Sequence, residues 1–274
     1  SIEVLILNIS FSVLMSIYRD ETPSNLRQCL ESLEAQTLKA TDVVLVEDGE
    51  IDSVLLSTIE EFRHSLNIKS VKLAQNIGLA AALNKGLEAC DYTYVARMDT
   101  DDVCLPTRFE KQISFLIAHP DIAVVGALVE EYDVTMSAPS GIRHTPSEHA
   151  DIMAFAKRRS PLSHPTVVFR KEAVVAVGGY PLFRKAQDYA LWSLMLQRGY
   201  MLHNVPEVLL NMRAGAGMME RRKADHLKYE LAILKYQRSI GFLTPSEYLF
   251  NVCARSITRL SPAFVRTLIY KFAR

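Results

Sequence analysis

Cysteine is scarce in this chain of 274 residues, and its few cysteines form no metal-binding or disulfide pattern. They are Cys29, Cys90, Cys104 and Cys253, which lie far apart and include no Cys-x-x-Cys pair. Zinc sites and disulfide-rich secreted scaffolds use cysteines at characteristic close spacings. The sequence therefore excludes both classes of protein and predicts a reducing, cytoplasmic location.

Long apolar runs and net charge are lacking as well. No stretch approaches the roughly 20 apolar residues that span a bilayer, and residues 1–10 lack the basic start and the cleavage site of a signal peptide. We therefore expect no membrane-spanning segment and leave residues 1–10 unassigned. The formal net charge is zero, which argues against general binding of nucleic acid. The charge is uneven, however, because residues 213–274 hold 12 Lys and Arg against 4 Asp and Glu.

Short β-branched runs alternate with helical stretches from residue 11 to about residue 129. This alternation is typical of a parallel α/β sheet. The expected strands are residues 11–17, 43–47, 70–73, 93–98 and 122–129. Farther along, the pattern predicts a helix over 148–157, a short apolar run at 166–169 and a helix that begins near Gln187. We predict an α/β fold with a doubly wound sheet.

Polar residues follow the first four expected strands. They are Tyr18, Arg19 and Asp20, then Glu47, Asp48 and Gly49, then residues 76–78, and finally the aspartates at positions 99, 101 and 102. In open α/β sheets, ligands bind beyond the carboxyl ends of the strands. Loops between strands and helices are polar in any case, but four consecutive polar strand ends favour one shared crevice.

Asp99, Asp101 and Asp102 follow an apolar, β-prone run. In a strand, alternate residues share a face, so the first two would project together. Hard oxygen ligands suit Mg²⁺ or Mn²⁺, and an ion held by one or two carboxylates keeps positions open for phosphates. A solvated acidic loop is the alternative. A calcium-binding EF-hand loop is excluded, because Cys104 stands where that loop needs glycine and Val103 where it needs a ligand.

The order of these motifs resembles family 2 of the glycosyltransferases, the inverting enzymes that use nucleotide sugars and have an A-type fold. The resemblance covers roughly residues 11–213. It rests on five motifs in order: Ser12 to Tyr18 with Arg19-Asp20-Glu21; Val46-Glu47-Asp48-Gly49; Asn76-Ile77-Gly78-Leu79-Ala80 with Asn84-Lys85-Gly86; Arg97-Met98-Asp99-Thr100-Asp101-Asp102; and His164-Pro165-Thr166 through Gly178-Gly179-Tyr180 to Gln187-Asp188-Tyr189-Ala190-Leu191-Trp192. It implies a Rossmann-like, mostly parallel central sheet flanked by helices. The catalytic domain would span residues 11–213, with a nucleotide-sugar-binding half at 11–130 and an acceptor-side half at 131–213. Residues 214–274 would form a helical, basic C-terminal region.

The resemblance implies a UDP-sugar donor and Mn²⁺ or Mg²⁺ as cofactor. Asp48 would accept a hydrogen bond from a uracil N–H, while Tyr18 would pack against the base. An aspartate before glycine is also a routine turn residue. Asp99 and Asp101 would hold the ion that stabilises the departing UDP as a Lewis acid. The expected donor-binding residues are Tyr18, Asp20, Asp48, Asn76, Lys85, Arg97, Asp99 and Arg213.

The roles of Arg97 and Arg213, the two arginines of that set, each leave a question open. Arg97 would add positive charge near the phosphates, but an arginine beside acidic residues is as often part of a structural ion pair. Arg213 stands where related enzymes often carry a short Arg-x-His segment that closes over the diphosphate. Here Ala214 and Gly215 follow it, so the histidine is missing and metal coordination by that segment is in doubt.

Asp188 is the expected general base. Inverting transfer needs one carboxylate that takes the proton of the acceptor hydroxyl as its oxygen attacks the anomeric carbon. The alternative is an acid at a helix N-terminus that only stabilises the helix dipole. His164, Gln187 and Trp192 are expected to line the acceptor pocket, although a histidine before proline is often structural.

The last residues combine basic and apolar side chains in an interfacial pattern. Residues 254–274 contain no acidic residue, and their basic residues are Arg255, Arg259, Arg266, Lys271 and Arg274. Such a segment is attracted to anionic lipid. A helix packed on the domain with a solvated basic face is the alternative. Docking would place the protein on the inner face of the bacterial cytoplasmic membrane.

Together these features predict a metal-dependent, inverting hexosyltransferase. It would move a hexose from a UDP-sugar to a saccharide acceptor linked to undecaprenyl diphosphate, with no nucleic acid as partner. By resemblance, the pathway is the synthesis of a surface polysaccharide such as O antigen or capsule. A nucleotidyltransferase is an alternative, but its glycine-rich phosphate loop is absent after the first expected strand. A non-catalytic assembly subunit is another, against which the intact Asp99, Asp101 and Asp188 speak.

Overall fold

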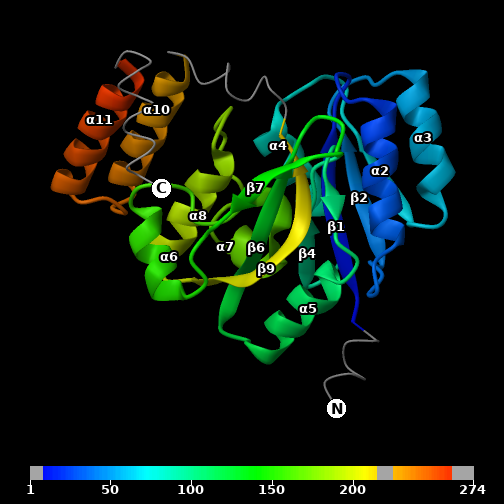
Figure 1. The fold of residues 1–274 in the computed structure, drawn as a ribbon, viewed down its shortest axis with the longest axis horizontal. Coiled ribbons are helices and arrows are strands. Elements are labelled where there is room, and N and C mark those ends of the chain that lie inside the picture. The colour runs from blue at the N-terminus through cyan, green and yellow to red at the C-terminus, as the bar shows by residue number, and fades with distance from the viewer. Residues whose placement is uncertain (1–8, 215–224, 261–274) are drawn as a thin grey trace.

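The computed structural model describes residues 9–214 and 225–260, which fold around one mixed β-sheet (Figure 1). The strands are β1 (Phe11–Ile17), β2 (Asp42–Glu47), β3 (Ile68–Lys72), β4 (Tyr94–Arg97), β5 (Val103–Cys104), β6 (Ile122–Tyr132), β7 (Pro139–Arg143), β8 (Val168–Arg170) and β9 (Met201–Arg213). Their order is β3-β2-β1-β4-β8-β6-β9-β5, and β7 pairs with β6. Within this order β3, β2, β1 and β4 run parallel, as the sequence predicts.

The second half of the sheet differs from a simple doubly wound pattern. Strand β8 is antiparallel to both of its neighbours, β4 and β6, whereas β6 and β9 are parallel. Strand β5 has two residues and pairs antiparallel with β9. The sequence analysis missed β5, β7 and β9, because two of them are short and the long β9 lacks a regular period-two pattern.

The helices form two layers, and these layers follow the alternation of side chains along the strands. The helices are α2 (Pro23–Glu34), α3 (Ser53–Arg63), α4 (Leu79–Ala89), α5 (Arg108–Ala118), α6 (His149–Ala156), α7 (Lys171–Ala176), α8 (Gln187–Gln197), α10 (Asp225–Ser239) and α11 (Pro245–Leu260), with a 3₁₀ turn η1 (His164–Thr166). Phe11, Val13 and Met15 point into the core under α2, α3 and α5. Leu14 points into the other core, with α4, α7 and α8.

Helix α4 approaches the sheet closely because of one glycine. A Cβ added at Gly86 would overlap the side chains of Leu14 and Val46. The close approach brings the start of α4 to the carboxyl ends of β1 and β2, where the polar loops lie.

The C-terminal helices α10 and α11 pack against the rest of the protein. Leu234 of α10, with Phe242 and Leu243 of the following turn, is buried in the same core as α8 and α4. Gln237 is also buried and donates a hydrogen bond from Nε2 to Ser193 Oγ over 2.7 Å. In Figure 1 this helix pair lies at the opposite end of the molecule from α2 and α3. None of the helices in the two described ranges is long and apolar enough to cross a membrane.

Candidate active site

The loops after β1, β2 and β4 meet at one edge of the sheet, because these strands are parallel neighbours. The loop after β1 continues into α2, whose first turn is capped by Thr22 Oγ1, which accepts from Asn25 N over 3.3 Å. The loop lies beside the aspartate motif, because Glu21 accepts a hydrogen bond from Thr100 Oγ1. The expected crevice residues of these loops are therefore neighbours in space.

Asp48 is buried at the end of β2 and organises the loop after β3. Its two carboxylate oxygens accept hydrogen bonds from Ile77 N over 2.7 Å and Gly78 N over 3.1 Å. Asn76 Nδ2 donates to the Asp48 carbonyl over 3.3 Å. A carboxylate has about four lone pairs, so Asp48 keeps acceptor capacity for an N–H of a ligand.

Three other expected donor residues lie at the surface. Tyr18 is 48% exposed. Asp20 is exposed and lies 3.6 Å from Arg19 in an ion pair. Lys85 is exposed on α4 and pairs with Glu88 on the same helix at 3.3 Å. Lys85 is therefore paired within α4, and it makes no hydrogen bond or ion pair with the described residues of the aspartate motif.

The aspartate motif lies in a turn, because β4 ends at Arg97. The strand alternation inferred from the sequence thus stops two residues before Asp99. Arg97 is fully buried, and its Nη2 lies 2.5 Å from Asp99 Oδ1. Arg97 therefore acts as a buried counter-ion of the motif. This contact is the structural ion pair that the sequence left open as the alternative for Arg97.

The carboxylates of the motif repel one another. Burial and the neighbouring charges of Asp99 and Glu21 raise the pKa of Asp101 to about 6. Burial, Asp99 and Asp101 also raise the pKa of Asp102 well above its usual range. A divalent cation beside Asp99 and Asp101 would relieve this repulsion, so the two residues fit a metal site. No closed set of three or more metal-ligating side chains occurs within residues 9–214 and 225–260, so such an ion would complete its coordination with oxygens of water or a substrate.

Arg213, at the end of β9, ties the aspartate motif to the rest of the crevice. Its backbone N–H donates to Asp102 Oδ1 over 2.9 Å, and its Nε donates to the Asp101 carbonyl over 3.0 Å. Its Nη2 reaches Gln28 Oε1 on α2 at 2.7 Å. Arg213 thus lies at the motif, and its binding of a diphosphate stays a prediction.

Glu21 belongs to the site although the sequence analysis gave it no role. It accepts a hydrogen bond from Thr100 Oγ1, and its charge contributes to the raised pKa of Asp101. Its position in the polar segment after the first strand was the available signal.

Asp188 lies in the first turn of α8, near the aspartate motif. Burial raises its pKa, while the backbone N–H groups of Tyr189 and of Asp188 itself partly oppose that shift. The charges of Asp99 and Arg97 also act on its pKa, in opposite directions. A carboxylate from the acceptor-side half therefore lies within electrostatic reach of the donor-side half.

His164 and Tyr180 form a buried pair in the same region. His164 Nε2 lies 3.0 Å from Tyr180 Oη, and burial together with Arg97 lowers the pKa of His164 well below its usual range. His164 is therefore neutral at pH 7. The Tyr180 backbone is held by Asn84 of α4, through Tyr180 N to Asn84 Oδ1 at 2.8 Å and Asn84 Nδ2 to Tyr180 O at 2.9 Å. The sequence analysis assigned no role to Tyr180 or Asn84, and nothing in the local pattern pairs them.

The other two expected acceptor residues are buried. Gln187 is 6% exposed at the start of α8, next to Asp188. Trp192 is fully buried, with its ring centroid 6.2 Å from that of His164. Trp192 is thus part of the core beside His164, and its role in an acceptor pocket stays a prediction.

The edge of a Rossmann-like sheet, a carboxylate pair suited to a cation and a nearby third carboxylate together define a nucleotide-sugar-dependent transferase of the A-type fold. Residues 12–189 match the model of glycosyl transferase family 2, and the chain belongs to this family.

Relatives in bacteria are similar over nearly their whole length. The amylovoran biosynthesis glycosyltransferase AmsE of Erwinia amylovora is 40% identical, over 95% of this chain and 98% of that protein. The UDP-Gal:alpha-D-GlcNAc-diphosphoundecaprenol beta-1,3-galactosyltransferase of Escherichia coli is 35% identical, over 95% of each chain. The mannosyltransferase PcManGT of Pyrobaculum calidifontis, solved with GDP-Man and Mn²⁺, superimposes with a TM-score of 0.62 at 15% identity, over 96% of this chain and 79% of that one. The fold expected from the sequence is confirmed, and so is the class of enzyme.

Proposed function

We propose that this protein is a metal-dependent, inverting hexosyltransferase that uses a UDP-sugar and acts on a saccharide linked to undecaprenyl diphosphate. The observation that carries the proposal is the position of Asp188 within electrostatic reach of Asp99 and Arg97. A base on one side of a reacting carbon and a diphosphate site on the other are what a single inverting displacement requires. The E. coli relative supports the donor and the acceptor class through the substrates in its name.

The chain's own residues divide the work. Asp48 and Tyr18 hold the uracil, and the loop that Asp48 organises bounds the base. Asp99 and Asp101 would hold Mn²⁺ or Mg²⁺, which when bound supplies Lewis-acid stabilisation of the departing diphosphate. Arg213 keeps Asp101 and Asp102 in place and adds positive charge beside the same oxygens.

Asp188 takes the proton of the acceptor hydroxyl. Burial raises its pKa, so it is a stronger base than a surface aspartate. Neutral His164, held by Tyr180, lines the acceptor side without placing a second positive charge beside Arg97. The biological role that follows is assembly of a bacterial surface polysaccharide, such as O antigen or capsule, at the cytoplasmic side of the membrane.

A donor screen tests the proposal. The purified protein is incubated with Mn²⁺, a panel of UDP-hexoses beginning with UDP-galactose, and a short-chain diphospholipid that carries N-acetylglucosamine. We expect one donor to give a disaccharide with an inverted anomeric configuration, and EDTA to abolish the product. Transfer that persists in EDTA contradicts the metal, and product with retained configuration contradicts the single displacement.

A further inference from the structure

One side of helix α11 presents apolar side chains to solvent. Leu249, Phe250 and Ile257 are 62%, 54% and 60% exposed, and Cys253 is exposed between them. The spacing of these positions places them along one face of the helix. Three of the ten large apolar side chains that are exposed in the described ranges thus lie on this single helix.

The other side of α11 is held against the domain, so the orientation of the exposed face is fixed. Asn251 is buried and donates from Nδ2 to the carbonyls of Lys157 at 2.9 Å and Glu247 at 2.8 Å. Arg255 Nη2 donates to the Arg158 carbonyl over 2.7 Å. Helix α11 is therefore anchored on the segment that follows α6.

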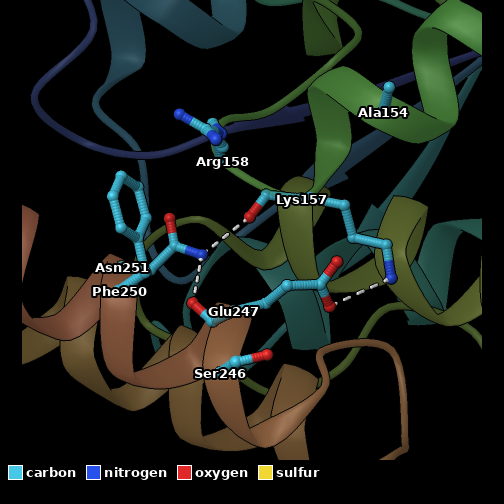
Figure 2. Close-up of a pocket in the computed structure, with 7 residues that line it drawn as sticks. All are labelled: Ala154, Lys157, Arg158, Ser246, Glu247, Phe250 and Asn251. Carbon is cyan, nitrogen blue, oxygen red and sulfur yellow. Dashed lines mark hydrogen bonds and ion pairs between the residues drawn. The ribbon is translucent and has the colours of Figure 1, made fainter.

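A basic side chain borders the apolar face, because the guanidinium of the exposed Arg158 lies 4.8 Å above the Phe250 ring. The next residue, Arg159, is also exposed, and its guanidinium lies 5.3 Å above the ring of Phe155 in α6. Arg158, Lys157 and Phe250 line a hollow of about 440 Å³ between α11 and the segment that follows α6 (Figure 2). At this hollow, Lys157 Nζ lies 3.7 Å from a Glu247 carboxylate oxygen. We call Arg158, Arg159, Leu249, Phe250, Cys253 and Ile257 the α11 face.

The basic residues singled out in the sequence do not form this surface. Arg255 and Arg259 both pair with Glu230 of α10, at 3.3 Å and 2.5 Å. Arg266, Lys271 and Arg274 lie outside the described residues.

We propose that the α11 face docks on the surface of an anionic lipid bilayer, with Leu249 and Phe250 at the acyl boundary and Arg158 and Arg159 at the headgroups. Exposed leucine and phenylalanine flanked by arginine suit the interfacial zone of a membrane. No acidic residue occurs between positions 248 and 260 that would repel a negative surface. The inference rests on the proposed lipid-linked acceptor, which would lie in such a bilayer.

Charge complementarity favours lipid over two other occupants. A second copy in a symmetric contact would bring together two surfaces that each contain Arg158 and Arg159 and no acidic residue, so neither copy would neutralise the charge of the other. The segment 261–274 of this chain contains three basic residues and no acidic one, so it offers no complementary charge. An anionic bilayer satisfies the arginines and the apolar side chains together.

Flotation of the full chain with vesicles tests the docking. The vesicles contain phosphatidylcholine alone or with phosphatidylglycerol, and the variants are R158A/R159A and F250S. We expect wild-type protein to bind only the anionic vesicles. Each arginine removed should weaken binding about fivefold, and F250S should weaken it about tenfold. K39E, a charge reversal at an exposed position after α2, and V54S, at an exposed apolar position of α3, are the matched controls and should bind as wild type.

Thermal unfolding and transfer to the short-chain acceptor are measured on the same variants, because neither should change when only docking is lost. The proposal is overturned if the wild-type protein does not bind anionic vesicles. It is also overturned if R158A/R159A and F250S bind them as the wild type does. A dimer in sedimentation that F250S dissociates assigns the face to a second copy and also overturns it. Deletion of residues 261–274 should leave vesicle binding in place, and its loss would assign docking to that segment. Failure of transfer to every acceptor with normal vesicle binding contradicts the proposed function and leaves the docking surface supported.

Discussion

At the scale of single residues, the site works through carboxylates in unequal surroundings. Burial is the largest cause of the raised pKa of Asp188, on which the charges of Asp99 and Arg97 act in opposite directions, whereas burial and the like charges of Asp99 and Glu21 together raise the pKa of Asp101. The first situation suits a base, and the second suits a ligand whose charge a cation neutralises. The two aspartates therefore predict different responses to the same substitution.

Asp188→Asn should lower kcat by about 10² to 10⁴ fold while binding of the UDP-sugar survives, because the amide keeps the shape but cannot take the proton. Steady-state kinetics and calorimetric titration with UDP measure the two effects. Asp151→Asn is the matched control, since Asp151 is an exposed acid in the first turn of α6. If both variants lose only stability, Asp188 is a helix-dipole residue.

Asp101→Asn should raise the melting temperature of metal-free protein at pH 7.5 and abolish stabilisation by Mn²⁺. The sign follows from the pKa of about 6: ionised Asp101 destabilises the native state above that pH, and protonation relieves this repulsion as the pH falls through it. In the wild type, protons should compete with Mn²⁺ below about pH 6, so its apparent affinity should fall there. A melting temperature that drops in the metal-free variant would contradict the repulsion.

At the scale of elements, the site depends on loops that are held from outside the crevice. Helix α4 clamps the turn before α8 through the two hydrogen bonds between Asn84 and Tyr180. A Cβ at Gly179 would press against the Asn84 side chain, and Gly179 has a φ of 79° that favours glycine. The turn therefore fixes the position of Tyr180 near Asp188, and Tyr180 in turn contacts His164.

Asn84→Ala should reduce transfer mainly through the acceptor. Loss of two hydrogen bonds at a partly buried turn costs about 1–3 kcal/mol, and the released Tyr180 no longer orients His164. We expect the KM for the acceptor to rise and the KM for the UDP-sugar to stay close to wild type. Asn25→Ala, on α2, is the control, and equal changes in both KM values would show that the clamp is a general stability element.

At the scale of the whole molecule, the C-terminal helices α10 and α11 pack against the core of the rest of the protein. The sequence suggested a separate region from residue 214 onward, but Leu234, Phe242 and Leu243 are buried in the core that also contains α8. Removing these helices would expose this apolar surface to water. The division of the chain into a catalytic domain and an appendage remains a prediction that the following experiment decides.

Leu234→Ala should destabilise the full chain by about 2–5 kcal/mol, which lowers the melting temperature by roughly 5–15 °C for a protein of this size. Leu249→Ala, at an exposed position of α11, is the matched control and should change it by less than about 2 °C. A fragment of residues 1–214 should fail to give a cooperative unfolding transition. A stable fragment that binds UDP would instead confirm a separable catalytic domain.

The sequence by itself determined the features that depend on local periodicity. It placed β1 at residues 11–17 and came within a few residues for the neighbouring strands, because side chains buried on both faces leave continuous apolar runs. It also placed Asp48, Asp99 and Asp101 at one edge of the sheet, since parallel strands bring their carboxyl ends to the same edge.

Only the tertiary structure decided which distant groups meet. Three such contacts have no signature in local sequence: the proximity of Asp188 to Asp99, the burial of Trp192 beside His164, and the pairing of Arg255 and Arg259 with Glu230. Such contacts arise when layers of helices pack on both faces of a sheet, and that packing depends on side-chain volumes across the whole core. Arg255 and Arg259 of α11 accordingly pair with α10, while the apolar side chains Leu249, Phe250 and Ile257 of the same helix are exposed to solvent.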